Sequence, residues 1–394
     1  LEAADFLNYN RQGHAYAEQV LGNPNFIRQF INGDNSFGLG GNTTNSPFTT
    51  QLLTSDNQYL LSQPGWNSIP DILDPSREIL FYDNKNVPNR IYQDSASKDH
   101  YISFDGGNEK GTYYLGLGAL DNDGLILGSG FKRYSGKFSG SYKVSKNIKI
   151  NSNVLYSHSN LSLSGLGDDA TVFRRFQGQA PTSRDFDNNP DGTFSNVYAV
   201  GQNQGFGNPL YYQDKFVRKN LEQRLSANVG ISWDIIEDLQ LKVVGSHFTV
   251  NNHNESFNRA YRKGSTSGPL ITGREAGVSL GRTLRNQLTG TLNYTKKIDV
   301  HNFNALIGAE YFKNNYFSSS AGTRNSPTDL IETLNAGAEA NGIPTSFETE
   351  YVISSTFGRL LYDYDNKYLV SATYRYDGSS RLGNEKFGFF PGVS

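Results

Sequence analysis

Apolar and polar side chains alternate over most of the chain from about residue 95 onward. In residues 131–144 one set of alternate positions holds Tyr, Gly, Phe and Val, and the other holds Arg, Lys and Ser. Residues 223–235 and 284–294 repeat this pattern. Because successive side chains of a β-strand point to opposite faces, the pattern predicts strands with one apolar and one polar face. Further strands are predicted at residues 97–105, 112–121, 147–159, 239–253, 302–317, 350–364 and 368–377.

The connections between these strands alternate in length. Short polar turns are predicted at residues 145–147, 237–238, 299–302 and 365–367, whereas residues 160–220, 254–278 and 318–349 are long segments rich in Gly, Asn, Asp and Ser. Long strands with short turns at one end and long loops at the other are typical of an outer-membrane β-barrel. The predicted fold class is therefore all-β: a transmembrane antiparallel β-barrel with long extracellular loops and short periplasmic turns.

Residues 1–94 follow a different pattern. Residues 3–30 have apolar side chains at helical spacing, and residues 33–70 are rich in Asn, Ser, Thr and Gly without sustained periodicity. We expect a region of loop with one or two short helices at the start of the barrel, followed by barrel strands over residues 95–394.

Composition and charge narrow the function classes. The chain has 394 residues with 41 Gly, 24 Tyr and 25 Phe, which favours β-structure with tight turns. Its longest apolar run, residues 113–120, is too short for a membrane-spanning helix. A net charge of −2 with interspersed signs makes a nucleic-acid partner unexpected. The absence of cysteine removes disulfides, thiol catalysis and cysteine-ligated zinc.

Three ordered stretches carry a resemblance to a known family. Residues 102–110 read ISFDGGNEK and precede FKRY at 131–134, and residues 301–311 read HNFNALIGAEY. Residues 374–383 read YRYDGSSRLG and precede FGFFPGVS at 387–394. These stretches resemble the SusC/RagA family of TonB-dependent outer-membrane transporters of Bacteroidetes. Leu382 and Gly392 depart from the Phe and Ser that are usual in that family.

The resemblance implies a 22-stranded barrel, of which this chain would supply about ten strands as the N-terminal half. It also implies a plug domain, a TonB box and a signal peptide, none of which we find in the chain. The implied function is TonB-dependent import of an oligomeric nutrient across the outer membrane, with a glycan favoured over a peptide. A SusD-like surface lipoprotein would form the lid, and TonB–ExbB–ExbD would act through the plug.

Two other functions remain open from the residues alone. One is a structural or adhesive outer-membrane barrel without cargo. The other is an outer-membrane hydrolase that would use Asp168 and Asp169 in the long loop. No serine lies in a nucleophile-elbow context, and the six histidines lack metal-ligand spacing, so we expect no enzyme.

Candidate ligand contacts are loop residues that can stack on a sugar ring or donate hydrogen bonds to its hydroxyls. These are Trp66, Arg174, Arg175, Tyr211 and Tyr212. Asp187, Asn189 and Asp191 have the oxygen spacing of a calcium loop, although Tyr198 stands where such a loop ends in Glu. We expect no other cofactor.

The family-like stretches contain residues with expected structural roles. Gly106 and Gly107 are expected to supply the positive φ angles of a tight hairpin. Arg375 and Asp377 are expected on the luminal side of their strand, in the same block as Gly378, Ser379 and Ser380. Residues 389–391, Phe-Phe-Pro, are expected to form an interfacial turn.

Overall fold

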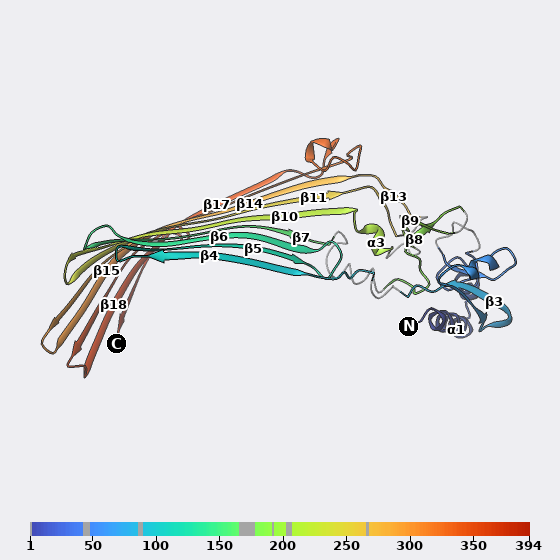
Figure 1. Cartoon of the computed structure of the whole chain (residues 1–394), viewed down its shortest axis with the longest axis horizontal. Coiled ribbons are helices and arrows are strands. Elements are labelled where there is room, and N and C mark those ends of the chain that lie inside the picture. The colour runs from blue at the N-terminus through green and yellow to red at the C-terminus, as the bar shows by residue number, and fades with distance from the viewer. Residues whose placement is uncertain are drawn as a thin grey trace.

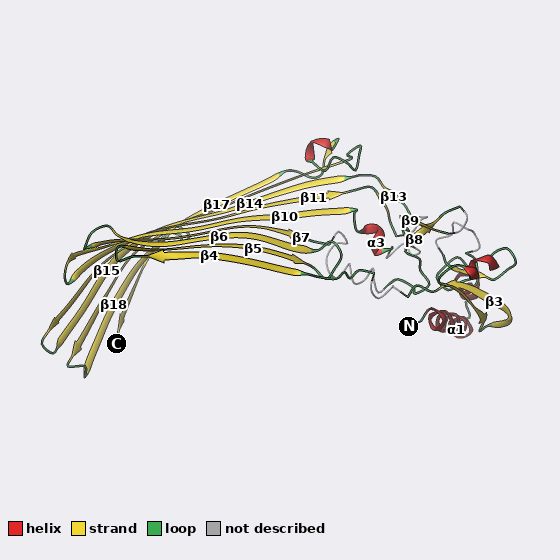
Figure 2. Cartoon of the chain, in the orientation of Figure 1, coloured by secondary structure: helices red, strands yellow, loops and turns green. Residues whose placement is uncertain are grey.

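The computed structural model of the chain describes residues 2–41, 48–85, 90–164, 178–190, 193–201, 207–264 and 268–394. Most of these residues lie in one long, twisted antiparallel sheet, and Figure 1 shows a smaller unit beyond one end of its strands. Helices occur only in that unit and in loops within the described residues (Figure 2). None of the helices described is both long enough and apolar enough to cross a lipid bilayer.

The main sheet follows the order of the chain. Each strand pairs antiparallel with the next, and β16 (Glu339–Ala340) adds only beside β15. All ten predicted strands are present, and the longest reach 24 residues, beyond the lengths the pattern predicted. The strands of the ladder are β4 (Ser97–Gly107), β5 (Gly111–Asp123), β6 (Gly130–Lys143), β7 (Ile148–Ser162), β10 (Phe216–Ile236), β11 (Leu239–Asn258), β14 (Glu275–Ile298), β15 (His301–Arg324), β17 (Thr345–Tyr364), β18 (Tyr368–Ser379) and β19 (Phe387–Val393).

The two ends of the sheet differ as predicted. Short turns lie at one end, and the longer loops and the smaller unit lie at the other (Figure 1). Three turn residues, Asp299, Asp365 and Asn366, have φ angles of 50°, 51° and 54°. Asp and Asn tolerate this left-handed conformation better than other non-glycine residues, which suits them to tight turns.

The turn between β4 and β5 corrects one expectation. Gly106 and Gly107 belong to β4 and do not have positive φ angles. Instead, the turn is held by Asn108, whose Oδ1 accepts hydrogen bonds from the amides of Lys110 at 2.8 Å and Gly111 at 3.0 Å. The glycines provide space, because a Cβ on Gly106 would lie 2.7 Å from the hydroxyl oxygen of Tyr113.

The segment expected as an interfacial turn is also different. Phe389, Phe390 and Pro391 lie within β19, which pairs with β18 through Tyr374↔Pro391 and Tyr376↔Phe389. A proline lacks the amide that a ladder needs, and β19 has only β18 beside it among the described strands. The expected turn is therefore wrong: this segment is a strand with one described neighbour.

The smaller unit is more ordered than the expected loop. A helix, α1 (Ala3–Leu21), and a π-helical turn, η1 (Ile27–Ile31), accompany a three-stranded sheet. Leu7 of α1 packs on Ile79 and Phe81 on one side of this sheet, and Leu60 and Leu80 pack on the other. Both faces are thus covered, which removes the alternation that marks the barrel strands. The remaining elements of the unit are β1 (Thr50–Leu52), the 3₁₀ turn η2 (Gln58–Ser62), β2 (Trp66–Asp71) and β3 (Asp74–Tyr82).

Short elements fold within the loops at the same end. They are β8 (Phe186–Asn188) paired with β9 (Phe194–Tyr198), the single turn α3 (Pro209–Tyr212), β12 (Tyr261–Arg262) paired with β13 (Leu270–Ile271), and η4 (Leu334–Ala336).

Candidate functional site

One face of the main sheet carries a continuous apolar band. Residues that pair across neighbouring strands form rows that run across the sheet. On this face, the rows consist of apolar residues. Tyr294 and Tyr311 lie at the two margins of the band on β14 and β15, and both are exposed. Exposed apolar side chains between two aromatic margins are typical of a lipid-facing wall. Two such rows are Phe104, Leu115, Phe138, Val154 and Ala227, and Trp233, Leu241, Leu292 and Ile307.

The opposite face holds a polar network at mid-height. Arg375 of β18 donates from Nε to Asp377 Oδ1 at 2.7 Å, and its Nη2 lies 3.6 Å from Glu310 Oε1 of β15. The other Glu310 oxygen accepts hydrogen bonds from Gln287 at 2.9 Å and Thr289 at 3.3 Å, both on β14. The luminal orientation predicted for Arg375 and Asp377 therefore comes with a pairing between them. Sequence reasoning missed Glu310, although it lies inside one of the family-like stretches.

Gly378, Ser379 and Ser380 lie at the C-terminal end of β18. Ser379 ends the strand, and Ser380 exchanges hydrogen bonds with Val352 of β17, receiving one at its Oγ at 2.9 Å and donating its own amide at 3.0 Å. A Cβ on Gly378 would lie 2.3 Å from the ring of Phe387. Gly378 therefore leaves room for an aromatic side chain of β19, which is a packing role.

Tyr211 and Tyr212 hydrogen-bond to the loop that follows β11. The hydroxyl of buried Tyr212 donates to the carbonyl of Arg262 at 2.8 Å and accepts from the amide of Gly264 at 2.7 Å. The hydroxyl of Tyr211 accepts from the amide of Arg262 at 2.9 Å. The two side chains fix the backbone between β11 and β14, so the structure gives them a different role from the predicted stacking on cargo.

The other predicted ligand contacts are placed as follows. Trp66 is only 6% exposed and packs with Leu60 and Leu80, so a ligand cannot reach its ring without opening that core. Arg174 and Arg175 lie outside the described residues, as do Asp168 and Asp169 of the hydrolase alternative.

The calcium hypothesis stays a prediction, because Asp191 also lies outside the described residues. Asp187 lies 3.5 Å from the guanidinium of Arg184. Asn189 turns its amide nitrogen toward Thr193 at 3.0 Å and the carbonyl of Phe194 at 3.2 Å. Elsewhere in the described part of the chain, no three His, Asp or Glu side chains come together as metal ligands.

A buried ion pair joins the segment between β3 and β4 to the loop before β8. Arg90 donates to the Ser183 hydroxyl at 3.0 Å and to its carbonyl at 2.7 Å, and pairs with Asp185. Asn84 donates to the same Ser183 carbonyl at 2.9 Å. Burial lowers the pKa of Arg90 and raises that of Asp185, so each charge depends on the other for compensation. Asn84 and Arg90 are thereby held to residues 183–185.

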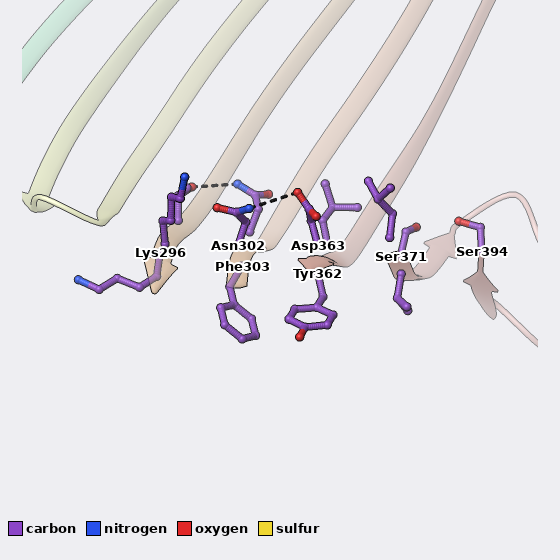
Figure 3. A pocket seen from close by; sticks show the side chains of 13 residues that line it. Lys296, Asn302, Phe303, Tyr362, Asp363, Ser371 and Ser394 are labelled. Atoms are coloured by element: carbon purple, nitrogen blue, oxygen red, sulfur yellow. Dashed lines mark hydrogen bonds between the residues drawn. The ribbon is translucent and has the colours of Figure 1, made fainter. Parts of the chain in front are cut away.

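A hollow of about 350 Å³ lies at the opposite end, among the short turns of β14, β15, β17 and β18. Asn302 donates to Asp363 there at 3.2 Å. Figure 3 shows Phe303 and Tyr362 projecting away from Asn302 and Asp363. Strand alternation places these two rings on the same face as Ile307. The strand ends next to these turns and Ser394 also line the hollow.

No protein-family model matches the chain. A curated relative, the TonB-dependent receptor P3 of Formosa agariphila, is 25% identical over 319 residues, or 78% of this chain and 31% of the relative. TonB-dependent receptor P39 of the same organism is 27% identical over 313 residues, or 78% and 29%. The TonB-dependent receptor SusC of Bacteroides thetaiotaomicron is 23% identical, covering 79% and 32%.

In sequence, this chain is similar to TonB-dependent receptors that include SusC, in agreement with the SusC/RagA resemblance predicted above. Solved structures agree in fold: the RagAB peptide transporter aligns over 79% of the chain and 35% of its own, with a TM-score of 0.66 and 22% identity. The RagAB peptide importer in its open-open state aligns over 100% and 41%, with a TM-score of 0.71 and 19% identity. The SusC/RagA-like segment spans about a third of the length of its curated relatives.

The SusC/RagA-like segment is part of an outer-membrane β-barrel wall. Its apolar band faces lipid and its polar face lines the lumen, as alternation requires. The long loops are extracellular, and the short turns are periplasmic. The hollow in Figure 3 therefore lies at the periplasmic base of the wall.

Proposed function

We propose that the full-length protein imports an oligomeric nutrient across the outer membrane in a TonB-dependent manner, and that the cargo is a glycan. The observation that carries this proposal is the strand register, which opposes an apolar outer band to a hydroxyl- and amide-rich luminal face. Such a wall encloses water and suits a polar cargo. The similarity to the TonB-dependent receptor SusC supports the TonB-dependent part of this proposal.

The glycan assignment rests on luminal chemistry. Arg375, Asp377 and Glu310 on the luminal face are bonded to one another, and the amide of Gln287 and the hydroxyl of Thr289 lie beside them. Sugars present many hydroxyls, which such groups bind. The RagAB structures are named for peptide transport, so a peptide cargo is the competing outcome.

The proposal includes two partners and no catalysis. A SusD-like lipoprotein would cover the extracellular loops, and TonB–ExbB–ExbD would supply energy through a plug. Co-purification of a surface lipoprotein with the tagged full-length protein is the expected result for the first. Recovery of the receptor without any lipoprotein would contradict the lid.

Deletion of the gene for the full-length protein tests the import function. The deletion strain should fail to grow on one class of glycan and recover when the wild-type gene is restored. Loss of growth on peptides instead would change the cargo class. Unchanged growth on every glycan and peptide would refute import.

A further inference from the structure

A hollow of about 600 Å³ lies on the apolar face of the wall, at the periplasmic ends of β5, β6 and β7. Its floor is the register row of Tyr113, Gly140 and Ser152, in which two of the three residues are small. This row lies between the row of Phe138, which belongs to the apolar band, and the row of Tyr142, which is nearest to the turns. The hollow is therefore a depression in the surface that faces lipid.

Three aromatic rings frame this hollow. The Tyr113 ring lies over Gly106 of β4, because a Cβ on Gly106 would lie 2.7 Å from the Tyr113 hydroxyl. The Tyr142 ring lies over Gly111 of β5, where a Cβ would lie 3.0 Å from it. Tyr113, Phe138 and Tyr142 are nevertheless 54%, 42% and 54% exposed. The rings therefore lie along the wall and present their apolar surface to whatever enters the hollow.

Four exposed lysines surround the two turns directly below the hollow. Lys110 lies in the turn between β4 and β5, and Lys146 lies in the turn between β6 and β7. Lys143 ends β6 and pairs in register with Lys149 of β7, so two like charges lie directly opposite each other. The two turns adjoin, because the Lys143 amide donates to the Lys110 carbonyl at 2.7 Å. Glu109 is the one acidic residue in these turns, which leaves an excess of positive charge.

The lysines of other periplasmic turns have partners inside the chain. Lys296 pairs with Asp238, and Lys367 lies 2.6 Å from Asp365. By contrast, none of the four lysines below the hollow forms an ion pair among the residues that the structure describes. An anion bound beside them would relieve their mutual repulsion.

We propose that this region binds an anionic phospholipid of the periplasmic leaflet, with an acyl chain in the hollow and the phosphate beside Lys110 and Lys146. The hollow opens to the hydrocarbon of the bilayer, so an acyl chain is the group available to fill it. Basic clusters at a membrane surface attract anionic headgroups, and each lysine adds to the affinity. Lys143 and Lys149 lie on the luminal parity and add positive charge behind this headgroup. The site goes beyond the import function and does not depend on the class of cargo.

Native mass spectrometry of the full-length protein in detergent tests this site by lipid titration. The probes are dioleoylphosphatidylglycerol and dioleoylphosphatidylethanolamine, which share acyl chains but differ in net charge. We expect phosphatidylglycerol to bind more tightly, and the double variant Lys110→Gln, Lys146→Gln to lose about 30-fold in affinity for it. The double variant Lys132→Gln, Lys367→Gln is the matched control, because it removes the same charge from lysines that already have carboxylate partners.

Ser152→Leu tests the hollow separately from the lysines. Leucine fills the hollow and suits a lipid-facing strand, so this variant should fold and should bind both phospholipids less tightly. The heat-modifiable shift on gels verifies that each variant forms the barrel. Equal affinity of the wild type for the two lipids, or an equal loss in the control variant, would overturn the site. Unchanged phosphatidylglycerol binding by Ser152→Leu would also overturn it, since the lysines would then act as surface charge without the hollow.

Discussion

Substituting Val243 by Arg tests which face of the wall meets lipid. Val243 of β11 lies in the same row as Ile231 of β10 and Gly290 of β14. This row is near the middle of the apolar band, between the margins marked by Tyr294 and Tyr311. An arginine on the lipid face at that depth costs about 2–4 kcal/mol, or roughly 30- to 1,000-fold in the ratio of folded to unfolded protein.

Val244→Arg is the matched control, since it places the same charge one residue along the same strand. Val244 lies on the luminal parity, in a row with Gly230 and Thr289, and Thr289 donates to Glu310. Urea titration of the full-length protein in lipid vesicles, followed by the heat-modifiable shift of the folded barrel on gels, should show a large loss for Val243→Arg and little for Val244→Arg. Equal losses of stability in the two variants would indicate that both faces are buried, as in a soluble sandwich. A larger loss for Val244→Arg would mean that the face of Val244, and not that of Val243, meets lipid.

Three further predictions concern the smaller unit and the loop that follows β11. Arg11→Ala should destabilise the smaller unit by about 1–3 kcal/mol, because buried Asp71 loses two hydrogen bonds and keeps only the partly exposed Arg77 as an ion-pair partner, and hydrogen exchange should rise in α1 and β2 but not in the barrel strands. Burial opposes ionisation of Asp71, but hydrogen bonds from Arg11 and the Leu73 amide outweigh this effect and lower the pKa of Asp71. The ionised carboxylate therefore stabilises the folded unit at neutral pH, and this stabilisation should disappear as the pH falls below the ordinary pKa of Asp. The stability of Asp71→Asn should lack this acid-dependent part. Tyr212→Phe should leave the Arg262 carbonyl and Gly264 amide without their partner, at a local cost of about 1–3 kcal/mol, and raise hydrogen exchange only in residues 259–264.

The barrel strands could be predicted because two different environments act on them. Lipid on one side and water on the other impose alternation at every position, as in residues 131–144. Short turns between consecutive strands then force neighbours in sequence to become neighbours in space. The ladder order from β4 to β19 follows directly.

The smaller unit could not be predicted in the same way. In β3, Ile79, Leu80 and Phe81 are consecutive and all buried, because α1 covers one face of the small sheet and η2 lies against the other. A run of three apolar residues has no periodicity that separates a strand from a helix or a loop. The helix itself was indicated by spacing, but its packing partners were not.

The candidate site was predictable only within single strands. Arg375 and Asp377 are two residues apart, so alternation alone places them on one face. Their link to Glu310 depends on the pairing of β15, β17 and β18, which local sequence does not encode. Trp66 and Tyr212 show the converse difficulty, because an aromatic side chain in a polar segment suits a core as well as a ligand.

The luminal face carries both paired and unpaired charges. Glu310 is already bonded to Arg375 and Gln287, whereas Lys242 of β11, in the same register row as Arg375, has no ion pair among the described residues. A transport path needs binding that is strong enough to capture cargo and weak enough to release it. Removing Arg375 would leave the negative charges of Glu310 and Asp377 without their cation. This part of the luminal face would then be negatively charged.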